Sequence, residues 1–76
     1  MICKIKMNTE NDVVKVSEVA AKTGIDMSVS CGNDMIDPRS LLGLFNFIGK
    51  EAVLVAPDDM DHRYFQKVVK RMGVAV

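Results

Sequence analysis

DPRSLLGLFNFIG, residues 37–49, is the most informative stretch of this sequence. Asp37 belongs to the residue types that cap helix N-termini, and Pro38 suits a first helical position because its missing N–H needs no partner there. Gly49 suits the left-handed turn that ends many helices. The stretch therefore predicts a helix of about three turns, at roughly 3.6 residues per turn.

This predicted helix carries more apolar side chains than one buried face requires. The 3–4 spacing of a core stripe is followed by Leu41, Leu44, Phe45 and Ile48. Leu42 falls on another side of the helix. Ser40 falls in the first turn, where the helix dipole and unpaired N–H groups favour an anion. A short helix with surplus apolar surface near its N-terminus is typical of a docking site.

Composition restricts the class of protein. A chain of 76 residues with 49% hydrophobic content makes one small globular domain rather than a disordered chain. Basic and acidic residues cancel, and no Lys/Arg run marks a nucleic-acid or membrane surface. The longest apolar run, residues 52–56, is too short to span a bilayer, and residues 1–6 lack the apolar block of a signal peptide. We expect a soluble, cytoplasmic protein without nucleic-acid or membrane partners.

The cysteines and the single histidine indicate no metal site or cofactor. Cys3 and Cys31 are too few and too far apart for a disulfide framework, and both fall on apolar strand faces, which predicts buried, inert thiols. His62 follows three nearby aspartates, which would fit a metal cluster. A solvated first helical turn explains that pattern better, because a lone histidine rarely finds enough co-ligands.

The order of helices and strands is predicted from the alternation and helical spacing of apolar residues and from capping residues. Thr9 and Asp12 form the capping pattern of a helix start. The β-branched pair Val13-Val14 would favour a strand, but the helical period of the apolar residues that follow indicates a helix. Apolar stripes at helical spacing are Val13, Val16, Val19 and Ala20 in one helix and Phe65, Val68, Val69 and Met72 in another. Aspartates 58, 59 and 61 are expected in the first turn of that last helix. Strands are expected at residues 3–7, 25–31, 35–36 and 51–56. The order β-α-β-β-α-β-α favours an α+β fold with one antiparallel sheet and all three helices on one face.

The motif Arg39-Ser40-Leu41-Leu42-Gly43-Leu44, followed by Gly49, a strand and a helix opened by Asp58-Asp59, resembles the HPr family. These are the small phosphocarrier proteins of the bacterial sugar phosphotransferase system. Their pattern here is a Lys-Ser pair before a short apolar helix, so arginine replaces lysine. The resemblance implies one HPr-like domain over residues 1–76, an open-faced β-sandwich of strand order 1-4-2-3. It also implies regulatory phosphorylation at Ser40 and partner contacts through Arg39, Leu41, Leu42 and Phe45.

The other half of the family signature differs. The family carries its phosphoryl group on a histidine in a Gly-Leu-His-x-Arg-Pro motif before the first helix. In this sequence the histidine would fall near Thr9 and the arginine near Asn11. Phosphohistidine transfer needs an imidazole nucleophile and donors for the phosphoryl oxygens, whereas Glu10 and Asp12 would repel that group.

We therefore predict a non-enzymatic, HPr-like regulatory or adaptor protein that does not carry phosphate on histidine. Its expected partners are phosphotransferase-system enzymes, a serine kinase or a transcription regulator. One alternative is an active phosphocarrier that uses an unusual acceptor such as Thr9 or His62. Another is a structural module without phosphorylation, in which Ser40 only satisfies backbone N–H groups at a helix start.

Overall fold

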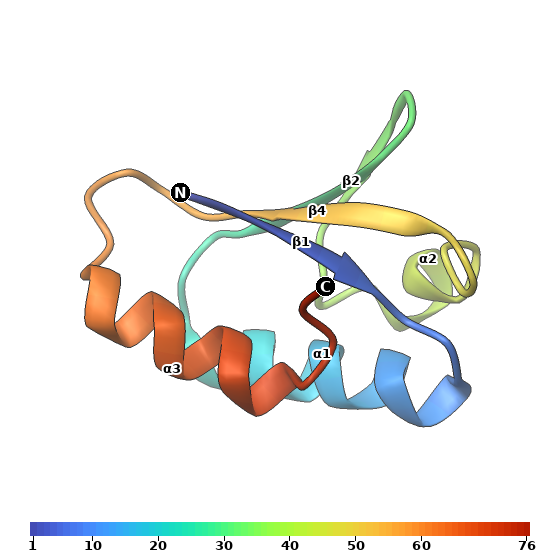
Figure 1. Cartoon of the computed structure of the whole chain (residues 1–76), viewed down its shortest axis with the longest axis horizontal. Coiled ribbons are helices and arrows are strands. Elements are labelled where there is room, and N and C mark those ends of the chain that lie inside the picture. Colours follow the sequence, from blue (N-terminus) through green and yellow to red (C-terminus); the bar gives the residue numbers. More distant parts are fainter.

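The computed structural model describes all 76 residues. They form four strands and three helices in the predicted order (Figure 1): β1 Ile2–Lys6, α1 Glu10–Thr23, β2 Ser28–Cys31, β3 Asp34–Ile36, α2 Leu41–Phe45, β4 Glu51–Val55 and α3 His62–Met72. No helix is long and apolar enough to cross a membrane.

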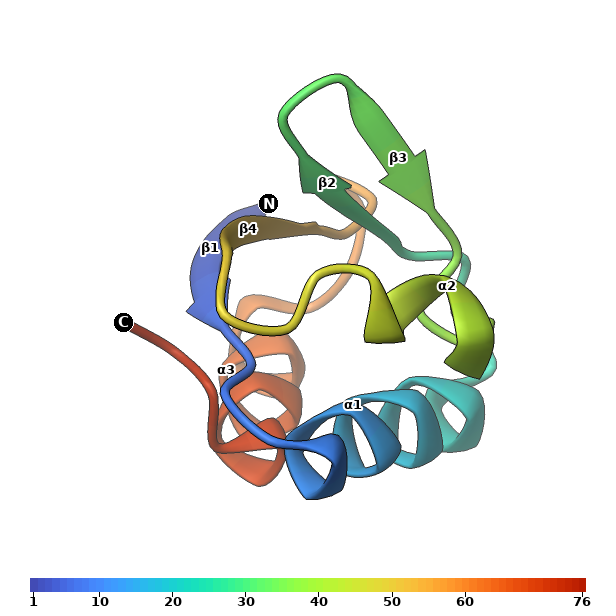
Figure 2. The ribbon, with the colours of Figure 1, turned by 90° about the vertical axis from the view of Figure 1, so that its right-hand side faces the viewer.

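The strands make one antiparallel sheet in the order β1-β4-β2-β3. Figure 2 shows α1 and α3 together under one face of this sheet, with α2 on the same side near its end, while the other face is uncovered. This arrangement is an open-faced β-sandwich. The predicted fold class and strand order are confirmed.

The central strand β4 explains an apolar pattern in the sequence. It pairs with β1 on one side and with β2 on the other, so Leu54 lies opposite both Cys3 and Val29. Ala52 and Leu54 are buried against the helices. Val53 and Val55 point to the uncovered face, where they are half-buried between the two neighbouring strands. The strand order implied by the resemblance, which puts the fourth strand between the first and the second, is confirmed.

The core fills the space between the sheet and the helices. Strand alternation puts Ile5, Val29 and Leu54 on the same face, and each is 0% exposed. The helices contribute the buried residues Val13, Val16 and Ala20 from α1 and Phe65, Val68 and Met72 from α3. Both stripes lie where the helical spacing predicted them, although Val19 and Val69 are only half-buried.

The start of α1 has the predicted capping box. The Asp12 N–H donates to Thr9 Oγ1 at 3.1 Å, and the Thr9 N–H donates back to Asp12 Oδ2 at 3.2 Å. The helix ends at Gly24 in the left-handed region, with φ of +66°. Caps at both ends fix the boundaries of the helix despite the β-branched Val13-Val14 pair.

The prediction that aspartates occupy the first turn of α3 is wrong. Asp61 is the N-cap, accepting the Arg63 N–H at 2.8 Å, and the helix begins only at His62. Asp58 and Asp59 lie in a preceding turn closed by the Met60 N–H donating to the Pro57 carbonyl at 3.1 Å. Met60 is 7% exposed. This turn directs the Met60 side chain into the core, and the helix begins two residues later, at His62.

The strand predicted at residues 25–31 is only half correct, because β2 begins at Ser28. Ser28 pairs with Val55, the last residue of β4. Beyond Val55, Ala56 exchanges hydrogen bonds with Met1 instead, and Pro57 has no N–H to donate. Residues 25–27 therefore have no strand to pair with, although Met27 still enters the core at 4% exposure.

Candidate functional site

Ser40 lies at the N-cap of α2, one residue before the helix begins. Its N–H donates to the Asp37 carbonyl at 2.8 Å, and its own carbonyl accepts the Leu44 N–H at 3.1 Å. The side chain makes no capping hydrogen bond, and the residue is exposed. The hydroxyl is therefore accessible from solvent, on a backbone that hydrogen bonds hold on both sides.

The helix itself is shorter than predicted. It spans Leu41–Phe45, not three turns from Asp37, because residues 37–40 form a separate turn in which the Ser40 N–H donates to the Asp37 carbonyl. The chain continues in tight turns, with the Phe47 N–H donating to the Leu44 carbonyl at 2.9 Å and the Lys50 N–H to the Phe47 carbonyl at 3.1 Å. Gly49 has the expected positive φ, +82°, and its N–H donates to the Met7 carbonyl at 2.7 Å.

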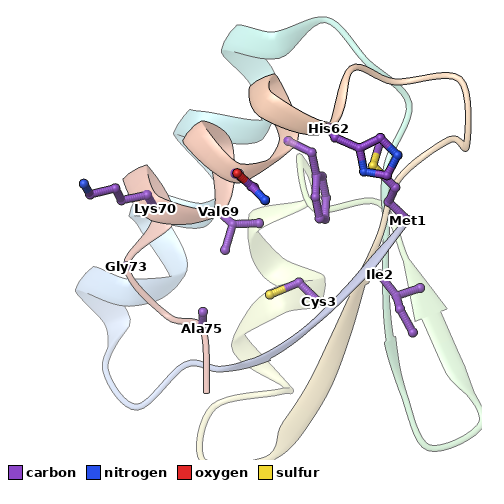
Figure 3. A pocket seen from close by; sticks show the side chains of 10 residues that line it. Met1, Ile2, Cys3, His62, Val69, Lys70, Gly73 and Ala75 are labelled. Carbon is purple, nitrogen blue, oxygen red and sulfur yellow. The ribbon is translucent and has the colours of Figure 1, made fainter.

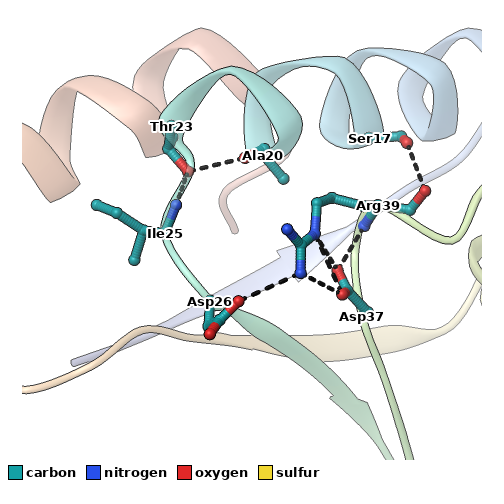
Figure 4. A network of polar contacts seen from close by, with 7 residues as sticks. All are labelled: Ser17, Ala20, Thr23, Ile25, Asp26, Asp37 and Arg39. Atoms are coloured by element: carbon teal, nitrogen blue, oxygen red, sulfur yellow. Dashed lines mark hydrogen bonds and ion pairs between the residues drawn. The ribbon is translucent and has the colours of Figure 1, made fainter.

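The side chain of Asp37 is committed to Arg39 (Figure 4). It accepts the Arg39 backbone N–H at 2.9 Å, Nε at 3.1 Å and Nη2 at 2.7 Å. Nη2 also contacts Asp26 Oδ1 at 3.2 Å, and the Arg39 carbonyl accepts from Ser17 Oγ at 3.4 Å. Arg39, predicted to bind partners, thus links the connection before β2 to the approach of α2.

The Asp37–Arg39 pair perturbs the titration of both groups. The hydrogen bond from the Arg39 side chain, followed by that from its backbone N–H, lowers the pKa of the Asp37 carboxyl. The same side-chain hydrogen bond, with the charge of Asp37, raises the pKa of Arg39. Both side chains are almost half exposed, so water screens the pair and its contribution to stability is small.

The apolar side chains of α2 divide between core and surface. Leu44 is 0% exposed, whereas Leu42 is 80% exposed and Leu41 is 38% exposed. Phe45 is half-buried. We call Leu41, Leu42 and Phe45 the α2 patch. The spacing of the sequence placed Leu42 correctly outside the core, but it placed Leu41 in the core stripe, and Leu41 is exposed.

Core residues also come from outside the predicted stripe. Phe47, 4% exposed, was not assigned to the stripe, and it is buried because the tight turns after Phe45 rotate it inward. Ile48, assigned to the stripe, is half-buried against the core. A helical period cannot locate side chains where the helix has already ended.

Gly43 allows α2 to approach β3 closely. A Cβ at this position would lie 3.0 Å from Ile36 Cδ1 and 3.3 Å from Ser40 Oγ. The glycine thus leaves room for the Ser40 side chain as well as for Ile36. This close approach is a further determinant of the candidate site, and the only sequence signal for it is a glycine among helical leucines.

The two alternative phosphoacceptors belong to the starts of the other two helices. Thr9 is occupied in the α1 capping box, next to the carboxylates of Glu10 and Asp12. His62 is exposed at the first position of α3. It lines the largest hollow in the molecule, about 660 Å³ between β1 and α3 (Figure 3), together with Cys3, Phe65 and Val69. None of the α2 patch residues lines this hollow.

The two cysteines differ from their prediction in burial. Cys3 on β1 and Cys31 on β2 are separated by β4 in the sheet, and both thiols are free. Each is only half-buried, so the predicted full burial is wrong. Both side chains pack against the edge of the core, and Cys3 also lines the hollow between β1 and α3. No group of three or more His, Cys, Asp or Glu side chains is arranged so that it could hold a metal ion.

Comparison with known proteins supports the fold. No protein-family model and no curated protein matches this sequence. Among solved structures, the chain resembles the crystal structure of HPr-C-His from Thermoanaerobacter tengcongensis, with a TM-score of 0.69 and 17% sequence identity. The match covers 100% of this chain and 97% of that one. At this identity the likeness concerns the backbone arrangement, and it extends from the first element to the last. The chain has an HPr-like fold.

Proposed function

We propose that this protein is an HPr-like regulatory or adaptor protein of the phosphotransferase-system type, which acts through protein contacts around Ser40. One observation carries the proposal. Ser40 is exposed at the N-cap of a short helix, its hydroxyl makes no capping hydrogen bond, and Leu42 beside it is 80% exposed. A serine that served only as a cap would direct its hydroxyl to the first-turn N–H groups. This one makes no such bond.

Phosphorylation at Ser40 would change the character of the α2 patch. A phosphate adds about two negative charges and three acceptor oxygens beside apolar Leu41 and Leu42. The fold tolerates such a charge because the N–H groups at the helix start favour anions. Arg39 is adjacent, but Asp37 and Asp26 already hold its guanidinium. The added charge therefore alters partner choice more than it alters stability.

The expected partners are a serine kinase and a phosphotransferase-system enzyme or a transcription regulator. Arg39 contributes at the rim of the surface, while Leu41, Leu42 and Phe45 supply its apolar centre. Truncation of a central, exposed apolar residue typically weakens binding more than truncation of a rim charge does. We thus expect Leu42→Ala to weaken partner binding more than Arg39→Ala.

The alternative of an active phosphocarrier is less well supported. Thr9 Oγ1 already accepts a backbone hydrogen bond, and two carboxylates adjoin it. No cationic donor stands beside Thr9 in the sequence to stabilise a transferred phosphoryl group. Thr9→His alone should restore little transfer, because Asn11 lacks the bidentate donors of an arginine.

Two incubations separate the three possibilities. With phosphoenolpyruvate and the first enzyme of the phosphotransferase system, we expect no acid-labile phosphate on the chain. With ATP and the serine kinase of that system, we expect one acid-stable phosphate, lost in Ser40→Ala and retained in the matched variant Ser30→Ala. Stoichiometric transfer from phosphoenolpyruvate would establish the carrier alternative. Absence of phosphate in both incubations would favour the structural module.

A further inference from the structure

A second surface lies on the helix layer, away from the α2 patch. α1 and α3 pack against each other under the sheet (Figures 1 and 2), and a groove of about 590 Å³ runs between them. Its lining is Lys15, Glu18, Val19, Lys22, Thr23, Tyr64, Val68, Lys70 and Arg71. We call it the α1–α3 groove. No residue of the α2 patch belongs to it, so it is independent of the function proposed above.

Helical spacing explains how the groove is built. On α1, Lys15, Val19 and Lys22 stand at positions i, i+4 and i+7, which share one side of a helix. On α3 the same spacing joins Tyr64, Val68 and Arg71. Val68 is 2% exposed and forms the apolar floor with half-buried Val19. The charged side chains are exposed on the rims.

The rims carry an uncompensated positive charge. Lys15, Lys22, Lys70 and Arg71 face a single carboxylate, that of Glu18. None of these five side chains takes part in an ion pair, since all ion pairs of the structure involve Met1 or Arg39. The chain as a whole has no net charge. Four clustered cations without partners in a neutral protein thus mark a local surface that attracts anions.

We propose that the α1–α3 groove binds an acidic peptide segment of a partner protein. Lys15 and Lys22 are seven residues apart, which on a helix is about 10 Å. An extended peptide covers that distance in about three residues, at roughly 3.3 Å each. Side chains of an extended peptide alternate in direction, so two carboxylates three positions apart point to opposite rims of the groove. One would reach Lys22 in the last turn of α1 and the other Arg71 in the last turn of α3, which lie at opposite ends of the groove because the two helices run antiparallel (Figure 1). A small apolar side chain between them would meet Val19 and Val68.

The geometry favours a peptide over other polyanions. Four cations are fewer than the roughly 6–10 phosphate contacts by which proteins hold nucleic acid at moderate salt. An anionic membrane would require apolar side chains beside the cations to enter the bilayer. Of the exposed large apolar residues only Tyr64, 40% exposed, lines the groove, whereas Leu42, Ile2 and Val76, the most exposed of them, lie outside it.

A titration followed by NMR tests the proposal. The probe is a capped eight-residue peptide with two glutamates three positions apart and a valine between them, and its control has glutamines in their place. We expect saturable amide shifts within residues 15–23 and 64–71. Lys22→Glu and Arg71→Glu should each weaken binding at least about tenfold. Lys50→Glu, which makes the same charge change on an exposed site outside the groove, should change it less than about twofold.

Several outcomes would overturn the proposal. These are no saturable shift with the glutamate peptide, equal shifts with the glutamine peptide, or equal weakening by Lys50→Glu. Tighter binding of a single-stranded oligonucleotide of matched charge, or of phosphatidylserine vesicles, would assign the groove to that ligand instead. Lys22→Gln and Arg71→Gln serve as milder variants, and dispersed spectra of all variants verify that they are folded.

Discussion

Leu42 and Leu44 stand two residues apart on α2 and have opposite surroundings, one 80% and the other 0% exposed. We expect Leu44→Ala to lower the free energy of unfolding by about 2–5 kcal/mol, because it leaves a cavity in the core. Leu42→Ala should change it by less than about 0.5 kcal/mol. Urea denaturation of both variants measures the difference. A large loss for Leu42→Ala would mean that this side chain packs inside, and the α2 patch would not exist.

The ion pair of Asp37 and Arg39 predicts a small pH dependence. The folded-state pKa of Asp37 is lowered, so its stabilising contribution is present above the unfolded pKa and is lost as pH falls through the folded one. We expect wild type to be slightly more stable than Asp37→Asn at pH 7, with the gap closing below about pH 4. Urea midpoints of both proteins from pH 2 to 7 measure this gap. A gap that widens in acid would contradict the assignment.

The residues of the candidate site differ in how far sequence could locate them. The 3.6-residue period was enough to set Leu42 apart from Leu44, since that depends only on neighbours within one turn. The role of Arg39 could not be derived in this way. Its contact with Asp26 joins residues 13 apart, and it exists only because the connection before β2 passes beside the approach to α2.

At the scale of elements, local signals located α1 well and α2 poorly. The Thr9–Asp12 capping box and the C-terminal Gly24 depend only on residues close in sequence, and both are present in the structure. Asp37-Pro38 has the same local signature of a helix start, yet Asp37 binds Arg39 and the helix begins at Leu41. Asp37 does accept the Arg39 backbone N–H, but this bond belongs to a separate turn, which the Ser40 N–H closes on the Asp37 carbonyl. A local capping signal does not tell whether a helix or a single turn follows it.

Gly43 offers a test of how α2 seats on β3. Alanine in a helix is favoured over glycine by about 0.5–1 kcal/mol, but its Cβ would lie 3.0 Å from Ile36 Cδ1. We expect Gly43→Ala to gain less than that amount, and Ile36→Val, which removes the opposing methyl, to restore the gain in the double variant. Denaturation of the four proteins gives the coupling energy. Strict additivity would show that α2 and Ile36 do not crowd each other.

At the scale of the whole molecule, the sequence patterns and the resemblance contributed different parts. Alternation and helical spacing indicated an antiparallel sheet with helices on one side, because those patterns report which faces are buried. They did not determine which strands are neighbours. The order 1-4-2-3 came from the resemblance to HPr proteins, and β4 lies between β1 and β2 as that order requires.

The sheet order also predicts which parts of the molecule open first. β4 is hydrogen-bonded on both sides and contributes Ala52 and Leu54 to the core, whereas β3 is a three-residue edge strand with Met35 64% exposed. The neighbouring α2 buries only Leu44 fully. We expect native-state hydrogen exchange to be slowest at Ala52 and Leu54, and fastest among the paired amides in β3 and α2.

Such a gradient bears on function, because segments that change partner or accept a modification are drawn from the less stable part of a fold. If α2 belongs to that part, the phosphate that we propose at Ser40 would reorganise the α2 patch without unfolding the sheet. Hydrogen exchange of the Ser40→Asp variant measures this: compared with wild type, its exchange rates should change in α2 and β3 and stay constant in β4. The aspartate supplies only one carboxylate for a doubly charged group, so the change should be smaller than that caused by phosphate. Equal acceleration throughout the chain would mean that α2 opens only when the whole domain unfolds.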